Sequence, residues 1–561
     1  MRLALTDIAN ILDQIGVNLE KYSLPQPENF QLDSDIYPQR PPLNAPPPAH
    51  IFESAPTNQH QNSDETMLDD YCEEVLTTEL NDEQQSFVQL VKDALDNKTD
   101  KRLFFLSAPG GTGKTTVLSV IAAHCHTKKI ETRNVAFTGI ASGLLIRGQT
   151  SHRAFGIPLN KEPHETTTSN IKLQSKQAQD LANVELIMWD ECSMIAGWQL
   201  EVVDHLMRKV KNCDLPFGGC VVILAGDLRQ LPPVLKNASR PELVEASIVC
   251  SRLWPSFHPV SLPTNMRISP GENEWGKFIL DVAEGRLNIP NTEEIDIPND
   301  LIEPFLEDLM SFVYDDFTAP DTHSSVIICP TNEGADEINN IALQRFQPEV
   351  HQTVFFSATS FIKDPTADDN GSNFSPEFLQ RKKSGSIPHH EIWLKPGVRV
   401  LLIRNLNPAQ GLCNGTRMIV ERIFNHSVLC RISSGLHKGE THFIPRIIFI
   451  TREFGLPGRL KRIQLPIRVA LHGITINRSQ GQTFRARVSL YLKRAPFSHE
   501  MLYVALSRGT RRSLMKICVI DTSTQGNRQR GVGGNRTRTK VIYTQNPIYF
   551  EILKHIPGFE F

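Results

Sequence analysis

Residues 104–116 of this chain read FFLSAPGGTGKTT. The apolar start predicts a short buried strand, the glycines predict a tight turn, and Lys114, Thr115 and Thr116 predict the first turn of a helix. Glycine allows several backbone N–H groups to converge on phosphate oxygens, and a helix N-terminus adds a favourable dipole. A strict phosphate loop has glycine where Ala108 stands, so the match is one residue short. The strand-turn-helix order nevertheless predicts a site for a nucleoside triphosphate.

The residues of this loop have separate expected roles. The Lys114 ammonium is expected to reach the β- and γ-phosphates, and the Thr115 hydroxyl is expected to bind Mg²⁺. Contacts to the nucleotide are expected from Ala108, Pro109, Gly110, Gly111, Thr112, Gly113, Lys114, Thr115 and Thr116. A glycine-rich turn before an ordinary helix is the alternative, and the apolar strand in front of the turn disfavours it.

Two later predicted strands end in polar residues that suit the same chemistry. Residues 186–191 read LIMWDE, where Asp190 is expected to hold Mg²⁺ and Glu191 to polarise the attacking water. A solvated turn is the alternative for such an acidic pair, and the phosphate loop elsewhere in the chain weakens it. Residues 221–233 read VVILAGDLRQLPP, and the Gln230 amide is placed to bridge a γ-phosphate to a neighbouring element.

Apolar runs and amphipathic stretches alternate from residue 80 onward, which predicts a doubly wound parallel sheet. The first set of predicted strands covers residues 102–107, 134–138, 184–189 and 221–225. A second set covers residues 325–329, 398–403, 467–474, 487–491 and 516–520. Residues 363–390 are rich in Gly, Ser, Asp and Pro and predict a long loop. Between residues 398 and 467, short β-like runs alternate with turns, which predicts a small barrel inserted in a second α/β domain.

Length and composition exclude several classes of protein. A chain of 561 residues is too long for one core, and 40% hydrophobic with 22% charged residues describes a globular chain. The sequence contains no run of 18 apolar residues, so it predicts no transmembrane helix. Asp7 and Asp13 interrupt the apolar stretch at the N-terminus, which argues against a secretory signal peptide. Ten cysteines without a CxxC pair predict a reducing compartment. His124, Cys125 and His126 lack matching ligands, so they are expected to be ordinary helix side chains.

The charge is distributed unevenly along the chain. The formal net charge of −3 hides −14 over residues 1–100, −8 over residues 101–400 and +19 over residues 401–561. A near-neutral total argues against a nucleic-acid-binding protein, whereas a strongly basic segment favours one. The placement of charge therefore predicts that residues 401–561 lie near nucleic acid.

Taken in order, the motifs resemble those of the Pif-type DNA helicases of superfamily 1B, and most closely the helicase part of Helitron transposon proteins. The resembling motifs lie at residues 80–84 (LNDEQ), 108–115, 138–142 (TGIAS), 148–152 (GQTSH), 189–194 (WDECSM), 226–230 (GDLRQ), 262–267 (LPTNMR), 473–483 (GITINRSQGQT) and 503–508 (YVALSR). The Helitron-like segments are residues 3–27, 405–406, 411–417, 464–466 and 546–553. Arg478 stands where the family usually has Lys, and Glu500-Met501 stands where Gly-Gln is usual.

This resemblance implies two RecA-like P-loop domains that face each other across ATP and Mg²⁺. Gln84 would read the adenine, and Arg267 and Arg508 would act as arginine fingers on the γ-phosphate. The implied catalytic residues are Lys114, Asp190, Glu191, Gln230, Arg267 and Arg508, with Thr115 and Asp190 as the metal ligands.

Contacts to single-stranded DNA are expected from Thr138, His152, Thr475 and Gln480. Phe155 is a candidate for stacking on a base, and a core phenylalanine after a turn is an equally weighted alternative.

The expected domain boundaries follow from these motifs. The first RecA-like domain covers residues 77–258, and the second covers residues 259–392 and 464–524, interrupted by an SH3-like β-barrel at residues 393–463. An amphipathic segment and an acidic, Pro-rich linker are expected at residues 1–76. Residues 525–561 are expected to be a basic flexible stretch and a C-terminal tail.

The implied function is that of an ATP-dependent DNA helicase that couples ATP hydrolysis to 5′-to-3′ translocation on single-stranded DNA and to duplex unwinding. Family roles lie in DNA repair, recombination and telomere maintenance. The expected partners are single-stranded and forked DNA and no membrane, and the protein is expected to be a monomer in the nucleus, with the mitochondrion as an alternative. The rival functions are a degenerate transposon-derived nucleic-acid-binding protein without unwinding activity and an RNA-directed helicase.

Overall fold

The computed structural model describes residues 80–158, 167–235, 238–314, 325–363, 374–383, 386–407, 410–433, 437–452, 456, 458–470, 472–482, 484, 486–531 and 538–559. These residues form two compact units, one from residues 348–470 and the other from residues 80–347 together with 472–559. The segment and linker expected at residues 1–76 lie outside the described residues. No helix in the described part of the chain is long and apolar enough to cross a membrane.

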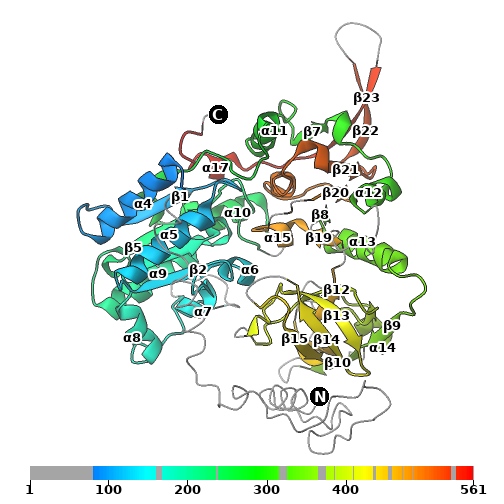
Figure 1. Ribbon diagram of the computed structural model, residues 1–561, viewed down its shortest axis with the longest axis horizontal. Coiled ribbons are helices and arrows are strands. Elements are labelled where there is room, and N and C mark those ends of the chain that lie inside the picture. The colour runs from blue at the N-terminus through cyan, green and yellow to red at the C-terminus, as the bar shows by residue number, and fades with distance from the viewer. Residues whose placement is uncertain are drawn as a thin grey trace, which may run out of the picture. The chain divides into compact units, whose positions relative to one another are not determined.

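A six-stranded parallel sheet with strand order β3-β2-β4-β5-β1-β6 carries the phosphate loop (Figure 1). Its strands are β1 (Leu103–Ser107), β2 (Thr132–Ala136), β3 (Gln149–Thr150), β4 (Leu186–Asp190), β5 (Val221–Gly226) and β6 (His258–Ser261). Side chains of β1 alternate between two separate cores. Leu103 and Phe105 belong to one core, and Phe104 and Leu106 belong to the other. Because both faces of the sheet are covered, its strands are continuously apolar in sequence, as parallel strands usually are.

Helices cover both faces of this sheet. The helices of this part are α4 (Asp82–Leu95), α5 (Lys114–Thr127), α6 (Gly139–Ser142), α7 (Ser151–Phe155), α8 (Lys176–Ala182), α9 (Gly197–Lys211) and α10 (Arg240–Ala246). Val91 of α4 and Ile121 of α5 belong to the same core as Phe104, whereas Leu200 of α9 belongs to the core of Phe105. The predicted doubly wound α/β arrangement is confirmed for this sheet.

A second parallel sheet has the strand order β19-β8-β20-β21. Its strands are β8 (Val326–Cys329), β19 (Gly473–Thr475), β20 (Val488–Leu492) and β21 (Met515–Val519). The helices near it are α11 (Asn273–Ala283), α12 (Leu306–Val313), α13 (Asn332–Arg345), α15 (Ile476–Ser479) and α16 (Met501–Leu506). Three of the predicted strands coincide with β8, β20 and β21, whereas the strand predicted at residues 467–474 is divided between β18 (Ile467–Val469) and β19.

The unit at residues 348–470 is antiparallel. A five-stranded sheet has the order β15-β14-β13-β12-β18, a three-stranded sheet has the order β10-β17-β16, and β11 pairs with β9. The bounds are β9 (Thr353–Phe356), β10 (Ala358–Lys363), α14 (Pro376–Gln380), β11 (Glu391–Leu394), β12 (Arg399–Leu402), β13 (Arg417–Ile423), β14 (Ser427–Ile432), β15 (Thr441–Pro445), β16 (Ile447–Thr451) and β17 (Gly458–Gln464). The unit is wider than the expected insertion at residues 393–463, because β10 pairs with β17 about a hundred residues later.

The C-terminal part differs from the flexible stretch expected at residues 525–561. Strands β22 (Gly526–Gly531) and β23 (Arg538–Gln545) form a hairpin, and β23 also pairs with β7 (Glu294–Ile297). Beyond the hairpin, Ile548 and α17 (Phe550–Leu553) pack into the core of the first sheet. The local composition of this stretch did not reveal a strand whose partner lies more than two hundred residues earlier.

Candidate nucleotide-binding site

The phosphate loop requires glycine at two positions. Gly111 and Gly113 have φ of 97° and 77°, in the left-handed region that favours glycine. A Cβ atom added to Gly113 would lie 2.5 Å from Gln84 Nε2, and one added to Gly111 would lie 2.4 Å from Arg267 Cβ. Ala108 is not among the residues with positive φ, its N–H donates to the Gly226 carbonyl at 2.9 Å, and its side chain is buried. Alanine therefore fits where the strict pattern has glycine.

Gln84 braces this loop from the first turn of α4. Its backbone N–H donates to Asn81 Oδ1 at 2.9 Å, and its Oε1 accepts the Asn81 N–H at 3.0 Å, which forms a capping box. Its Nε2 donates to the Thr112 carbonyl at 2.9 Å. The amide is thus committed to the helix cap and the loop in this structure, and its expected reading of adenine stays a prediction.

Lys114, at the start of α5, is paired with both acids at the end of β4. Its Nζ lies 2.7 Å from Asp190 Oδ1 and 3.3 Å from Glu191 Oε1, and all three side chains are nearly buried. Burial disfavours the ammonium, but the two carboxylates outweigh burial and raise the pKa of Lys114. The predicted phosphate ligand, metal ligand and water-polarising acid are therefore brought together.

Glu191 has a strained backbone and a second hydrogen-bond donor. Its φ of 54° is unusual for a residue other than glycine, and such strain is found most often at functional sites. Gln480 Nε2 donates to its Oε2 at 3.1 Å. Burial alone would raise the pKa of the Glu191 carboxyl, but Lys114, Gln480 and Arg508 together lower it. Glu191 is thus held ionised, as a residue that polarises water must be.

Gln230 lies in the turn after β5, where the sequence placed it. Its side chain is 4% exposed, and its Oε1 has no hydrogen-bond partner among the described residues. Its Nε2 lies 3.5 Å from Asp227 Oδ2. A buried amide oxygen without a partner is suited to bind a water or a ligand group at this site.

The two predicted arginine fingers lie at the phosphate loop. A Cβ atom added to Gly110 would lie 3.3 Å from Arg267 Nη1 and 3.3 Å from Arg508 Nη2. Arg267 Nη1 donates to the Ser507 carbonyl at 2.9 Å, and Arg508 Nη1 donates to the Gln482 carbonyl at 2.8 Å. Burial and the charge of Arg508 lower the pKa of Arg267. Two neighbouring guanidinium groups held by carbonyl oxygens are well placed to bind an anion between them.

The predicted DNA contacts are not brought together as a surface. The Thr138 hydroxyl caps α6 by accepting the Ala141 N–H at 3.2 Å, and the His152 ring lies 3.3 Å from Gln199 Nε2. Thr475 is 7% exposed at the start of α15, and Gln480 faces Glu191 rather than solvent. The structure therefore places Gln480 beside Glu191 of the candidate nucleotide site, which its motif did not predict.

Phe155 is a core residue, so the prediction that it stacks on a base was wrong. It is fully buried, and its ring centroid lies 5.7 Å from that of Trp189. The alternative of a core phenylalanine after a turn is confirmed. Trp189 of β4, which belongs to the same core, lies more than thirty residues later in the chain.

A metal ion would find two of its ligands here. Thr115 opens α5, and Asp190 ends β4. Among the described residues there is no group of three or more His, Cys, Asp or Glu side chains that could hold a metal ion. The donor set of one hydroxyl and one carboxylate fits Mg²⁺ that arrives with a nucleotide, because phosphates and waters complete its coordination. Cys125 is buried within α5, as expected for an ordinary helix residue.

Sequence reasoning missed the roles of Tyr503 and Asp227. The Tyr503 hydroxyl donates to Asp227 Oδ2 at 2.6 Å, and both side chains are buried. Both residues lie inside recognised motifs, so their place in those motifs was the available signal. The pairing itself depends on the folded arrangement of two segments 276 residues apart.

The parallel sheets, the phosphate loop and the Lys114–Asp190–Glu191 cluster define a P-loop nucleotide-binding protein. The model of the PIF1-like helicase family matches residues 79–293, and that of the 2B domain of DNA helicase Pif1 matches residues 377–423.

Among curated proteins, the ATP-dependent DNA helicase Pif1 of Psychrobacter sp. (strain PRwf-1) is 29% identical over 319 residues, which cover 57% of this chain and 44% of that protein. The ATP-dependent DNA helicase PIF1 of Homo sapiens is 25% identical over 425 residues, which cover 74% of this chain and 58% of that protein.

Solved structures show the same fold. The crystal structure of Bacteroides Pif1 bound to ssDNA matches with a TM-score of 0.56 at 22% identity, over 79% of this chain and 93% of that one. Pif1 helicase from Candida albicans matches with a TM-score of 0.55 at 22% identity, over 79% and 95%. The chain spans less than half of the length of the first curated relatives that it matches. Together these similarities show that residues 79–293 and 377–423 of this chain are similar to the corresponding parts of PIF1-like helicases.

Proposed function

We propose that this protein is an ATP-dependent DNA helicase that couples ATP hydrolysis to 5′-to-3′ translocation on single-stranded DNA and to duplex unwinding. One observation carries the proposal: Lys114, Asp190 and Glu191 form a buried cluster on the first sheet, and Arg267 and Arg508 reach the same loop. Two arginines and a buried acid that polarises water stabilise the transition state of hydrolysis, so their presence at one loop favours hydrolysis over nucleotide binding alone.

The residues divide the chemistry among themselves. Glycine N–H groups and Lys114 would bind the β- and γ-phosphates, while Thr115 and Asp190 would hold Mg²⁺, which supplies charge neutralisation on the phosphates. Glu191 would orient and polarise the attacking water, and Gln230 would accept or donate at the γ-phosphate. Arg267 and Arg508 would stabilise the charge that develops on the transferred group. Fingers of this kind are worth about 10³–10⁵ in rate in other nucleotide hydrolases.

Arg508 connects the nucleotide cleft to the second sheet. Arg508 lies two residues after α16, and Gln480 directly follows α15, so both side chains belong to that part of the chain. Hydrolysis would remove the phosphate charge that holds the two arginines, and the cleft could then open. Movement of this kind, repeated along a bound strand, is how ATP hydrolysis would drive translocation.

DNA is the proposed track. Its support is the charge of +19 over residues 401–561 and the relative solved with ssDNA bound. Thr138, His152, Thr475 and Gln480 remain proposed strand contacts. We propose further that the antiparallel unit is a small SH3-like barrel, that the chain is closest to the Helitron group within its family, and that it acts as a monomer in the nucleus in DNA repair, recombination or telomere maintenance.

Hydrolysis is tested with Lys114→Ala, which should abolish ATPase activity stimulated by single-stranded DNA. Lys128→Ala, at an exposed lysine just after α5, is the matched control and should keep the parent rate. Hydrolysis at the parent rate by folded Lys114→Ala would overturn the assignment of the site. An inactive parent protein that still binds DNA would instead support the degenerate nucleic-acid-binding alternative.

Unwinding and polarity are tested with forked DNA. We expect unwinding of substrates with a 5′ tail and none of substrates with only a 3′ tail. The opposite preference would refute the proposed direction without refuting the helicase activity. Matched RNA and DNA duplexes separate the RNA-directed alternative, which requires faster unwinding of the RNA.

A further inference from the structure

Tyr503 and Asp227 join the two sheets next to the nucleotide site. Tyr503 lies on α16 with its side chain 1% exposed, and Asp227 lies in the turn after β5 with its side chain fully buried. The 2.6 Å hydrogen bond from the phenol to the carboxylate is short and charge-assisted, which is the stronger class of hydrogen bond. Burial and Asp227 raise the pKa of Tyr503, and the Gly110 N–H of the phosphate loop opposes them weakly.

Asp227 organises the turn that contains Gln230. Its Oδ1 accepts the Arg229 N–H at 3.0 Å, and its backbone carbonyl accepts the Gln230 N–H at 2.9 Å. Its Oδ2, which receives the Tyr503 hydroxyl, also lies 3.5 Å from Gln230 Nε2. One carboxylate oxygen is therefore shared between the phenol from α16 and the amide that is proposed to contact the γ-phosphate.

α16 leads directly to Arg508. Arg508 Nε donates to the Val504 carbonyl at 3.0 Å, so the proposed finger is anchored to the same helix that carries Tyr503. A movement of α16 relative to the first sheet would thus change the position of Arg508 and the hydrogen bond to Asp227 together. Neither Tyr503 nor Asp227 has a role in the proposed chemistry described above.

We infer that Tyr503 is a positioning residue for ATP hydrolysis: through Asp227 it sets the Gln230 amide when α16 is docked, so that Gln230 and Arg508 reach the γ-phosphate in concert. The inference rests on the proposed function and adds a residue to it. Tyr503 itself need not touch the nucleotide, because its effect passes through the shared oxygen of Asp227.

Glu500, three residues before Tyr503, supports this reading. It is fully buried with a φ of 59°, and neither of its carboxyl oxygens has a hydrogen-bond partner among the described residues. Burial and Asp227 raise the pKa of Glu500, and Glu284 adds to this rise whereas Arg229 opposes it, so the surroundings favour the neutral form of the carboxyl. A neutral Glu500 leaves Asp227 with Tyr503 and Arg229 as its partners and adds no repulsion beside it.

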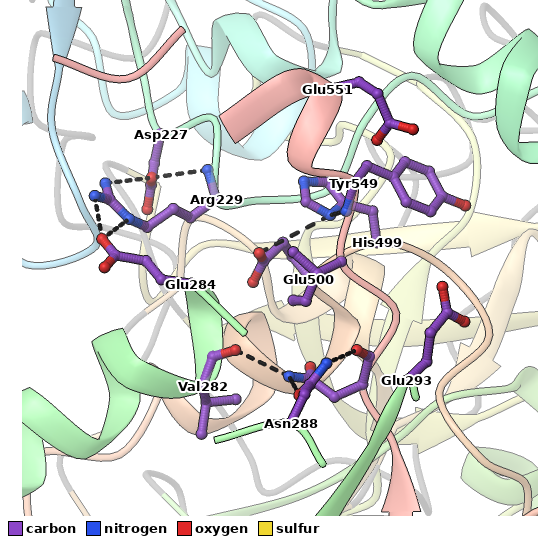
Figure 2. Close-up of polar contacts among 12 residues, drawn as sticks. Asp227, Arg229, Val282, Glu284, Asn288, Glu293, His499, Glu500, Tyr549 and Glu551 are labelled. Atoms are coloured by element: carbon purple, nitrogen blue, oxygen red, sulfur yellow. Dashed lines mark hydrogen bonds and ion pairs between the residues drawn. The ribbon is translucent and has the colours of Figure 1, made fainter. Parts of the chain in front are cut away.

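The neighbouring imidazole does not change that conclusion (Figure 2). His499 Nδ1 lies 3.9 Å from Glu500 Oε1, but it accepts the Tyr549 N–H at 2.9 Å. Burial lowers the pKa of His499 to about 3, so the ring is neutral and forms no ion pair. Figure 2 also shows the Arg229–Glu284 pair, in which Arg229 Nη2 lies 2.7 Å from Glu284 Oε1, on the other side of Glu500.

The test is a double-mutant cycle on steady-state ATPase activity with saturating single-stranded DNA. Tyr503→Phe removes one oxygen atom and should lower kcat by about tenfold while KM for ATP stays within about twofold, which is the signature of a lost transition-state interaction. Gln230→Ala should also lower kcat, and adding Tyr503→Phe to it should change kcat by less than about twofold. Asp227→Asn should reproduce the effect of Tyr503→Phe.

Tyr491→Phe is the matched control. Tyr491 is 3% exposed and lies on β20. The variant therefore also removes a buried hydroxyl, but one that does not contact Asp227. Its kcat should equal that of the parent.

A kcat within twofold of the parent in Tyr503→Phe would overturn the inference, and so would effects of Tyr503→Phe and Gln230→Ala that multiply. Equal losses in Tyr503→Phe and Tyr491→Phe would mean that only buried-hydroxyl stability is involved, which also overturns it. An inactive parent protein would refute the proposed function instead.

Discussion

Gln480 Nε2 donates a hydrogen bond to Glu191 Oε2 at 3.1 Å, although 289 residues separate the two in the sequence. Glu191 directly follows β4 of the first sheet, and Gln480 follows α15 beside the second sheet. Lys114 holds the other oxygen of the same carboxylate. The acid that is proposed to polarise water is thus oriented from both α/β parts of the molecule at once.

Gln480→Ala should therefore lower ATPase kcat. A hydrogen bond to a charged group is worth about 1.5–3 kcal/mol, so kcat should fall by about 10- to 150-fold. The measurement is steady-state hydrolysis with and without single-stranded DNA. Gln89→Ala, at an exposed amide on α4, is the control and should have no effect. If Gln480→Ala weakens DNA binding but leaves hydrolysis without DNA unchanged, Gln480 serves the strand as its motif predicts.

Gln480 and Phe155 illustrate how far the sequence could be interpreted. The phosphate loop, Asp190, Glu191 and Gln230 were predictable because each ends an apolar strand, and parallel strands bring their carboxyl ends to one edge. Phe155 could not be assigned, since one aromatic residue after a turn fits a core or a base equally well. The hydrogen bond of Gln480 to Glu191 could not be predicted because the two residues belong to distant segments, and the pairing of β23 with β7 was missed for the same reason.

Lys114→Ala should also destabilise the protein without nucleotide. The substitution leaves Asp190 and Glu191 buried and close together without their cation, and breaking a buried ion pair by removing one partner costs about 3–5 kcal/mol. Urea denaturation of the apo protein measures the loss. Adding Glu191→Gln to Lys114→Ala should recover part of it, because one of the two stranded charges disappears. No recovery would show that the cost comes from packing of the lysine stem.

Glu500 should make the stability of the protein fall as pH rises. The pKa of this carboxyl is raised in the folded protein above its usual value of 4.5, so the folded state binds the proton more tightly than the unfolded chain. The contribution to stability is complete below pH 4.5 and is lost as pH rises from there through the folded pKa, by at most about 1.4 kcal/mol per pH unit.

Glu500→Gln keeps the shape and cannot ionise, so its stability advantage over the parent should grow with pH across that window. Urea denaturation at several pH values between about 5 and 8, where most proteins are stable, measures this difference in the free energy of unfolding. Glu274→Gln, at an exposed position on α11, is the control and should show a constant difference. A constant gap between Glu500→Gln and the parent would show that Glu500 ionises normally.

The segment after the hairpin should be required for the stability of the first sheet. Ile548, Tyr549, Ile552, Leu553 and Ile556 are buried in the same core as Phe105 and Trp189. Arg240 donates to the Ile548 carbonyl at 2.9 Å and pairs with Glu551 at 3.0 Å, and Asn546 Nδ2 donates to the Val282 carbonyl at 2.9 Å. The segment thus contacts the first sheet's core and α11, which belongs to the second-sheet part.

Leu553→Ala should lower the free energy of unfolding by about 2–5 kcal/mol, because a fully buried leucine is replaced by a cavity. Lys554→Ala, at the exposed residue next to it, should change stability by less than about 0.5 kcal/mol. Thermal or urea unfolding, followed by tryptophan fluorescence, suits the measurement because Trp254 and Trp189 lie in the same core. If the two variants were equally stable, the C-terminal segment would not be part of this core in solution, and the first sheet would have to be stable with that face uncovered.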